Sequence, residues 1–129
     1  MAYTQNPQQK IVGFIKALFD VVIVGRLVKL TSTALVSASN AITLDCSKGD
    51  VFTNTPTETT SITAINFAEG QEITIIFLTS GTSSFTTTFG TGFKSTGTLA
   101  SGTSDAKRFV VKFISDGTQL IEVSRTTAM

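Results

Sequence analysis

The sequence predicts a mainly β protein: an antiparallel β-sandwich or jelly-roll-like domain, preceded by an extended or partly helical N-terminal arm. Two observations carry this prediction. From residue 41 onward, short runs of β-branched and aromatic residues recur at roughly ten-residue spacing, and clusters of Gly, Ser, Thr and Asp separate them. Residues 1–40 instead contain a polar start and one long apolar block. We therefore expect an anchoring arm over residues 1–40 and a trimer-forming sandwich over residues 41–129.

Eight strands are expected in the second region, and each is bounded by turn residues. Their alternation of apolar and polar side chains is the signal, together with Gly-containing turns such as 47–49, 80–82 and 90–92. In chain order, the expected strands are Ala41–Asp45, Asp50–Asn54, Ser61–Phe67, Glu72–Thr79, Ser84–Phe89, Phe93–Leu99, Lys107–Ser115 and Thr118–Ser124.

The apolar block of the arm spans residues 11–30, IVGFIKALFDVVIVGRLVKL. Its first half has apolar residues at helical spacing, whereas the β-branched run at 21–24 fits a strand equally well. Charges at Lys16, Asp20, Arg26 and Lys29 argue against a membrane span, because a central charge costs about 2.5–3.5 kcal/mol. These charges, and the lack of a small-residue cleavage site, also disfavour a signal peptide. We expect this block to anchor the protein to another protein through Ile11, Phe14, Ile15, Leu18, Phe19 and Val22.

The closing segment, residues 106–129, predicts a β-hairpin whose two-residue type I′ turn is Asp116-Gly117. In that register Phe113 faces Leu120 and Val111 faces Glu122. Apolar residues occupy both faces of the hairpin, and Ile76 and Leu78 repeat this pattern on the strand at 72–78. In a sheet with one solvent-exposed face, apolar and polar side chains would alternate along each strand. Because they do not alternate here, we expect a partner to cover the second face. We assign Phe109, Val111, Phe113 and Leu120 to the core, and to a trimer interface Val110, Ile114, Ile121, Val123, Ile76 and Leu78; the pattern also permits the two hairpin faces to be exchanged.

Composition disfavours most catalytic and cofactor chemistry. The chain has no histidine and one cysteine, Cys46, so neither a His-based triad nor a zinc site is expected. The acid pairs Asp45–Asp50 and Glu69–Glu72 bracket turns, and no tryptophan is available to stack on a sugar ring. A formal net charge of +1 offers no basic surface for nucleic acid. We expect a protein that is not an enzyme and that holds no cofactor and no metal.

Three segments carry a resemblance to known proteins. They are ITLDCSKGDVFTNTPTETTSITAINFAEGQEITIIFL, GTSSFTTTFGTGF and KRFVVKFISDGTQLIEVSR. Together they resemble the β-sandwich modules at the C-terminal ends of tailed-bacteriophage fibre, spike and head-fibre proteins. The resemblance is strongest in the terminal hairpin from Phe113 to Arg125; tryptophans common in the family are replaced here by Phe89, Phe93 and Leu120-Ile121. It implies a homotrimer on the surface of a virion.

Within that resemblance, the short chain favours a capsid decoration (cement) or short head-fibre protein on the capsid exterior. An arm followed by a compact knob suits attachment to the major capsid protein or another virion protein, and leaves no room for a fibre shaft. The alternative is a tail-fibre tip that recognises host surface glycan through the Ser/Thr/Gly-rich loops at 80–84 and 97–104. A carbohydrate-cleaving spike is a remote third hypothesis, because no convincing acid pair is present.

Overall fold

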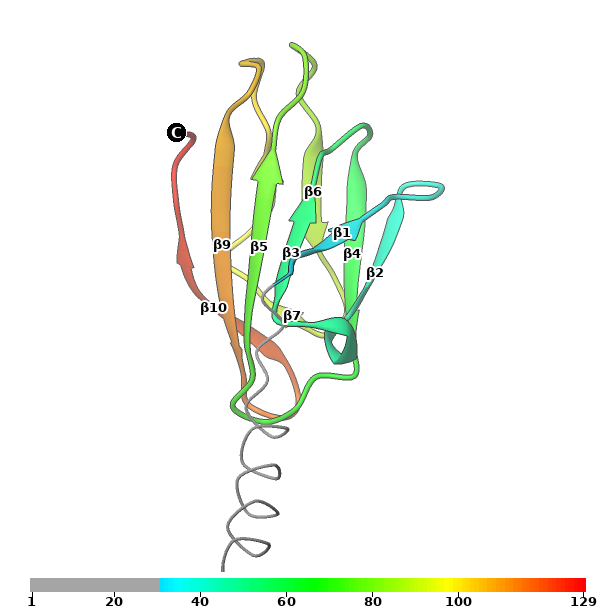
Figure 1. Ribbon diagram of the computed structural model, residues 1–129, viewed down its shortest axis with the longest axis vertical. Helices are drawn as coiled ribbons and strands as arrows, with labels where there is room; N and C mark the ends of the chain where they lie inside the picture. The colour runs from blue at the N-terminus through cyan, green and yellow to red at the C-terminus, as the bar shows by residue number, and fades with distance from the viewer. Residues whose placement is uncertain (1–30) are drawn as a thin grey trace, which may run out of the picture.

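A computed structural model describes residues 31–129, which form two β-sheets that face each other across a single core (Figure 1). The larger sheet has six strands in the order β1-β3-β5-β9-β10-β7, and the smaller has four in the order β2-β4-β6-β8. The fold is therefore mainly β, as the sequence predicts. The strands are β1 Thr33–Leu35, β2 Ala41–Asp45, β3 Val51–Asn54, β4 Thr60–Ile65, β5 Glu72–Leu78, β6 Thr86–Phe89, β7 Phe93–Lys94, β8 Leu99–Ala100, β9 Arg108–Ser115 and β10 Leu120–Arg125.

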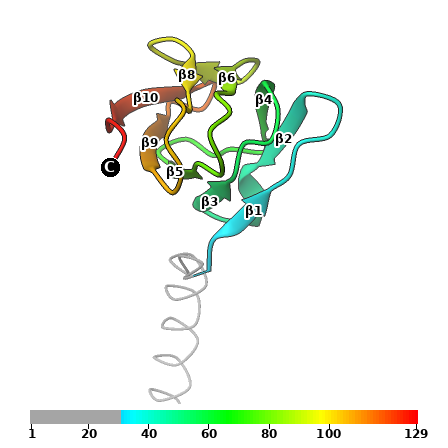
Figure 2. The ribbon, with the colours of Figure 1, turned by 90° about the horizontal axis from the view of Figure 1, so that it is seen from above.

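The first six strands wind as a β-solenoid, because consecutive strands alternate between the two sheets (Figure 2). Each strand then pairs in parallel with the strand one full coil later: β1 with β3 and β3 with β5 in one sheet, and β2 with β4 and β4 with β6 in the other. Ala41 lies opposite Ser61, so one coil takes 20 residues at that position. Three coils result, and their inward side chains fill the space between the sheets.

This winding corrects the expected antiparallel jelly-roll. Among the strands of residues 31–129, antiparallel pairing joins only β5 to β9, β9 to β10, and β6 to β8; an isolated antiparallel bridge also links Ala38 to Ala41. The alternation of apolar and polar residues predicts that a strand exists and which side chains point inward. It does not predict which strand lies alongside. The connections after β2 and β4 cross to the facing sheet instead of turning back, and this crossing makes the neighbours parallel.

Most of the expected strands are found within one to three residues of their predicted ends. The exception is the run at 93–99, which breaks into β7 and β8 on opposite sheets around Gly97, at φ 142°. On the N-terminal side, β1 pairs with β3 although it precedes the predicted boundary at residue 40. The folded unit therefore includes residues that the sequence assigned to the arm.

The core between the sheets is aliphatic at the β2–β4 side and aromatic near β6 and β7. Phe89 packs against Phe93 and Phe113 with ring centroids 5.4 and 5.2 Å apart. Gly92 lies where the two sheets meet: its φ is +87°, and a Cβ there would stand 2.6 Å from the carbonyl oxygen of Ala64. Its own oxygen accepts the N–H of Leu120. The turn at 90–92 thus fastens the end of the coil to the closing hairpin.

Candidate contact surface

The six apolar residues predicted for an interface lie on one face of the larger sheet, the face turned away from the core. Strand pairing places Ile76 opposite Val110, and Ile121 opposite Ile114. Val123 lies two residues beyond Ile121 on β10, and Leu78 lies two residues beyond Ile76 on β5. We call this set the outer patch: Ile76, Leu78, Val110, Ile114, Ile121 and Val123.

Three members of the outer patch are exposed to solvent although they are branched aliphatics. The exposed fractions are 37% for Ile114, 36% for Ile121 and 59% for Val123. The other three are half-buried within the sheet. The residues assigned to the core, Phe109, Val111, Phe113 and Leu120, are all buried. The structure therefore settles which hairpin face points inward, a choice that the sequence left open.

The hairpin register differs from the predicted one. Ser115 pairs with Leu120, so the loop has four residues, 116–119, instead of two. The carboxylate of Asp116 accepts hydrogen bonds from the backbone N–H groups of Thr118 and Gln119, at 2.8 and 2.7 Å, and these bonds stabilise the longer loop. They also lower the pKa of Asp116. The register shift is two residues, an even number, so side chains up to Glu122 keep their predicted face, whereas the bulge at Val123 exchanges the faces of Ser124 and Arg125.

A bulge in β10 explains why Val123 is the most exposed member of the patch. Glu122 pairs with Phe113, but the next pair is Ser124 with Lys112, so Val123 has no partner residue on β9. The extra residue bends the strand and pushes its side chain outward. Beside it lies a hollow of about 140 Å³, lined by Glu72, Ile73, Thr74, Lys112, Phe113, Ile114 and Val123.

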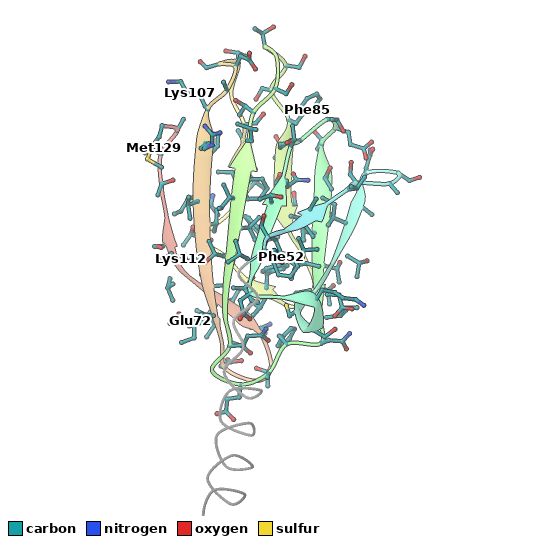
Figure 3. The ribbon with its side chains drawn as sticks, in the orientation of Figure 1. Phe52, Glu72, Phe85, Lys107, Lys112 and Met129 are labelled. Carbon is teal, nitrogen blue, oxygen red and sulfur yellow. The ribbon has the colours of Figure 1, made fainter. Side chains whose placement is uncertain are left out.

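Charged residues lie both within the outer patch and at its ends. Glu72 lies opposite Ile114, and Lys112 lies opposite Thr74, in the row between the two apolar pairs (Figure 3). Arg108 lies opposite Leu78 at the far end of the same face. The outer patch therefore consists of two apolar groups separated by Lys112: Ile76, Leu78 and Val110 on one side, and Ile114, Ile121 and Val123 on the other. A groove for a small apolar ligand would be deeper and more enclosed.

Directly behind the patch, a partly buried ion pair fixes β10 to the loop at 95–98. The Glu122 carboxylate accepts from Arg125 Nε at 2.9 Å, from Ser95 Oγ at 2.7 Å and from the Thr96 N–H at 3.0 Å. Burial alone would raise the pKa of Glu122, but these hydrogen bonds and the Arg125 charge outweigh it and lower the pKa to about 2. Arg125 also donates to the carbonyl oxygens of Gly97 and Thr98. This network holds the bulge in place.

Sequence analysis missed this ion pair, although a signal was present. The predicted register already placed Glu122 on the same face as Val111 and Phe113, which is the core side. A buried carboxylate requires a partner, and Arg125 is the nearest cation along the chain.

The residues that could have suggested catalysis are engaged in local structure. Burial, and then the charges of Asp45 and Asp50, raise the pKa of the Cys46 thiol to about 12, so it is not a ready nucleophile at neutral pH. Asp45 accepts from Ser47 and Asn66, and Asp50 accepts from Gln71. Cys46 and Asp50 border an open hollow of about 330 Å³, whose other lining residues are Ser47, Gly49, Asn66, Ala68 and Gln71.

Over the described residues, no group of three or more Cys, Asp or Glu side chains is placed to hold a metal ion. Between Thr31 and Met129 there is also no helix of the length and apolarity that a membrane crossing requires. The predicted anchoring residues Ile11, Phe14, Ile15, Leu18, Phe19 and Val22 lie outside the described part of the chain. No protein-family model, curated protein or solved structure matches this chain.

Proposed function

We propose that this chain is a structural protein of a tailed-bacteriophage virion, a homotrimer that decorates the capsid exterior. The outer patch is the single observation that carries the proposal. Branched aliphatics from β5, β9 and β10 share one face, and three of them are exposed by more than a third. Exposed apolar residues gathered on one face of a sheet are typical of a subunit contact.

In the proposed trimer, Val123 lies nearest the three-fold axis. It is the most exposed member of the patch, and a residue at such an axis meets its own equivalents in the other two copies. A specific interface buries about 800 Å² per partner, and apolar burial contributes roughly 25 cal/mol per Å² before the cost of association. The six patch residues supply the apolar part of that area; Glu72 and Arg108 lie at its two ends, and Lys112 lies between its two apolar groups.

The virion assignment rests on the sequence resemblance to phage modules and on the division of the chain. Residues 41–129 form the outward knob, and the apolar stripe at Ile11, Phe14, Ile15, Leu18, Phe19 and Val22 attaches it to the major capsid protein or another virion protein. A short head-fibre protein would have the same trimer and the same attachment segment but would occupy a different position on the capsid.

The second candidate is a receptor-binding tail-fibre tip that recognises host surface glycan. One observation favours it: the loops at 80–84 and 101–105 are hydrogen-bonded into one polar cluster at the end of the molecule opposite the β9–β10 turn (Figure 1). The Gly81 N–H donates to Asp105 at 2.7 Å, and the Gly102 N–H donates to Ser84 at 3.2 Å. Such loops suit adaptable contacts with hydroxyl groups.

The trimer is tested by light scattering of the full chain at micromolar concentration. We expect three times the 13.6 kDa chain mass for the wild type and a lower mass for Ile121→Asp. Ile65→Asp is the matched control, because Ile65 on β4 is exposed to a similar degree, 39% against 36%. Its mass should stay trimeric. A monomeric wild type contradicts the proposed interface.

The virion role is tested separately by immunogold labelling of particles and by binding of purified protein to them. We expect label on heads, and loss of binding but not of trimer mass in a Phe14→Asp/Leu18→Asp variant. Label confined to tails would overturn the capsid proposal and favour the fibre tip.

A further inference from the structure

One row of side chains crosses the outer face of the larger sheet with an acid at one end and a base at the other. Glu72 on β5 lies opposite Ile114 on β9. Ile121 on β10 pairs with Ile114 on one side and with Lys94 on β7 on the other. All four side chains are exposed and point away from the core. The row therefore reads acid, apolar, apolar, base.

Glu72 and Lys94 do not pair within one chain. They lie three strand spacings apart, which places their Cα atoms about 14 Å from each other, and side chains on a sheet stand roughly perpendicular to it. Lys112 lies diagonally across from Glu72 on β9 but forms no ion pair with it. Over residues 31–129, neither Glu72 nor Lys94 has a side-chain hydrogen bond or an ion pair. Two exposed charges of opposite sign thus flank the row.

The curvature of the sheet determines what the two ends of this row can meet. Figure 2 shows β5, β9 and β10 bending around the core, so the outer face is convex. When three convex faces pack around an axis parallel to their strands, the middle of each face points at the axis and its flanks point at two different neighbours. Rotation about that axis also keeps every residue at its own height. The Glu72 flank of one copy therefore meets the Lys94 flank of the next copy at the same level.

We propose that Glu72 of each copy forms an ion pair with Lys94 of the neighbouring copy, and that three such pairs fix the parallel orientation and the register of the trimer. The inference rests on the proposed trimer and names the contact that orients it. Ile114 and Ile121 lie between the two charges and supply apolar area near the axis. Ion pairs at a solvated rim contribute more to specificity than to affinity, so their role is to select this arrangement over others.

Charge reversal tests the pair in the full chain, by light scattering over a dilution series. We expect Glu72→Lys and Lys94→Glu each to raise at least tenfold the protein concentration at which half of the trimer has dissociated, because like charges then meet at every contact. Glu72→Lys/Lys94→Glu exchanges the charges and should return this concentration to within threefold of wild type. Glu69→Lys is the matched control, because Glu69 is an exposed acid on the loop before β5 and its substitution changes the net charge equally. It should stay within threefold of wild type.

The outcomes separate this contact from the trimer itself. A monomeric wild type overturns both proposals. A wild-type trimer whose double variant dissociates as readily as the single variants overturns the pair of Glu72 with Lys94 and leaves the trimer standing. Equal effects of Glu72→Lys and Glu69→Lys have the same meaning, because they would reflect net charge alone. Circular dichroism of each variant confirms that it is folded.

Zero-length coupling gives a second readout on the wild type. A water-soluble carbodiimide activates the Glu72 carboxylate, and the Lys94 amine then displaces the carbodiimide as a urea, which carries away the carboxylate oxygen and leaves an amide bond. We expect peptides that join Glu72 to Lys94 in the covalent dimer and trimer bands of a denaturing gel. Peptides that join Glu69 to Lys94 should be at least tenfold rarer. The Glu72–Lys94 peptide found only in the monomer band, or in no band, overturns the proposal.

Discussion

The two faces of the β9–β10 hairpin are equally apolar in sequence but differ in surroundings. On the inner face, Val111, Phe113 and Leu120 are at most 1% exposed. On the outer face, Ile114, Ile121 and Val123 are 36–59% exposed. Strand pairing alone does not produce this asymmetry, because both faces belong to the same ladder. It arises because the smaller sheet covers only one side.

This contrast separates stability from association. Inner residues gain their burial when the chain folds, so substituting them should act on unfolding. Outer residues stay exposed in the single folded chain and would be buried only between copies, so substituting them should weaken association.

Phe113→Ala should destabilise the protein by about 3–5 kcal/mol, because it removes a buried ring from an aromatic cluster and leaves a cavity. Ile114→Ala, its neighbour on the outer face, should cost about 1 kcal/mol or less. Urea unfolding followed by circular dichroism measures both. Similar losses for the two variants would contradict the proposed division between the faces.

Acid should weaken the inner face through Glu122, by up to about 3 kcal/mol. The pKa of this carboxyl falls from an ordinary 4.5 to about 2 in the folded chain. Its contribution is therefore complete above pH 4.5 and is lost as the pH falls toward 2. Unfolding free energies at pH 7 and pH 3 measure the loss. Asp45 and Asp116, whose pKa values are also lowered, contribute in the same direction, so the specific test is that Glu122→Gln loses less between the two pH values than the wild type.

Gly92→Ala should cost about 2 kcal/mol or more. The residue has φ +87°, and its new Cβ would approach the Ala64 carbonyl oxygen at 2.6 Å, so the backbone must shift. Gly70→Ala is a suitable control, because φ is +77° there but nothing lies within 4 Å of the new atom. Thermal unfolding should show a smaller decrease for the control. Equal decreases would mean that the left-handed backbone alone, and not the close approach of the sheets, carries the cost.

The sequence predicts the hairpin better than it predicts the coil, for a physical reason. The face of each side chain on β9, and on β10 as far as Glu122, follows from the alternation along the strand, which the two-residue error caused by the Asp116 loop does not change. Parallel neighbours in the coil lie one full coil apart in sequence, as Ala41 and Ser61 do. They are separated by another strand, so no single tight turn joins them and indicates that they pair. The offset between paired strands ranges from 19 residues for β1 and β3 to 27 for β4 and β6, so no fixed sequence period announces the coil.

The outer patch was predicted residue by residue, but the extra exposure of Val123 was not. That exposure depends on the bulge, and the bulge depends on Glu122 and Arg125, which hold the loop at 95–98 from the other side of the strand. A long-range contact of this kind leaves no periodic signal. The hollow beside Val123 is hidden from the sequence for the same reason.

Val123→Asp should leave the unfolding free energy of the single chain within about 0.5 kcal/mol of wild type, because the side chain is 59% exposed and packs against little. Its effect should be on association. Mass action makes the melting temperature of an assembled wild type rise with protein concentration, and a charge at the patch should remove that dependence. Melts over a hundredfold concentration range measure it, with Ile65→Asp as the control that retains the dependence. If wild type and Val123→Asp melt alike at every concentration, the outer face is not the contact between copies, and the asymmetry of the hairpin needs a different partner.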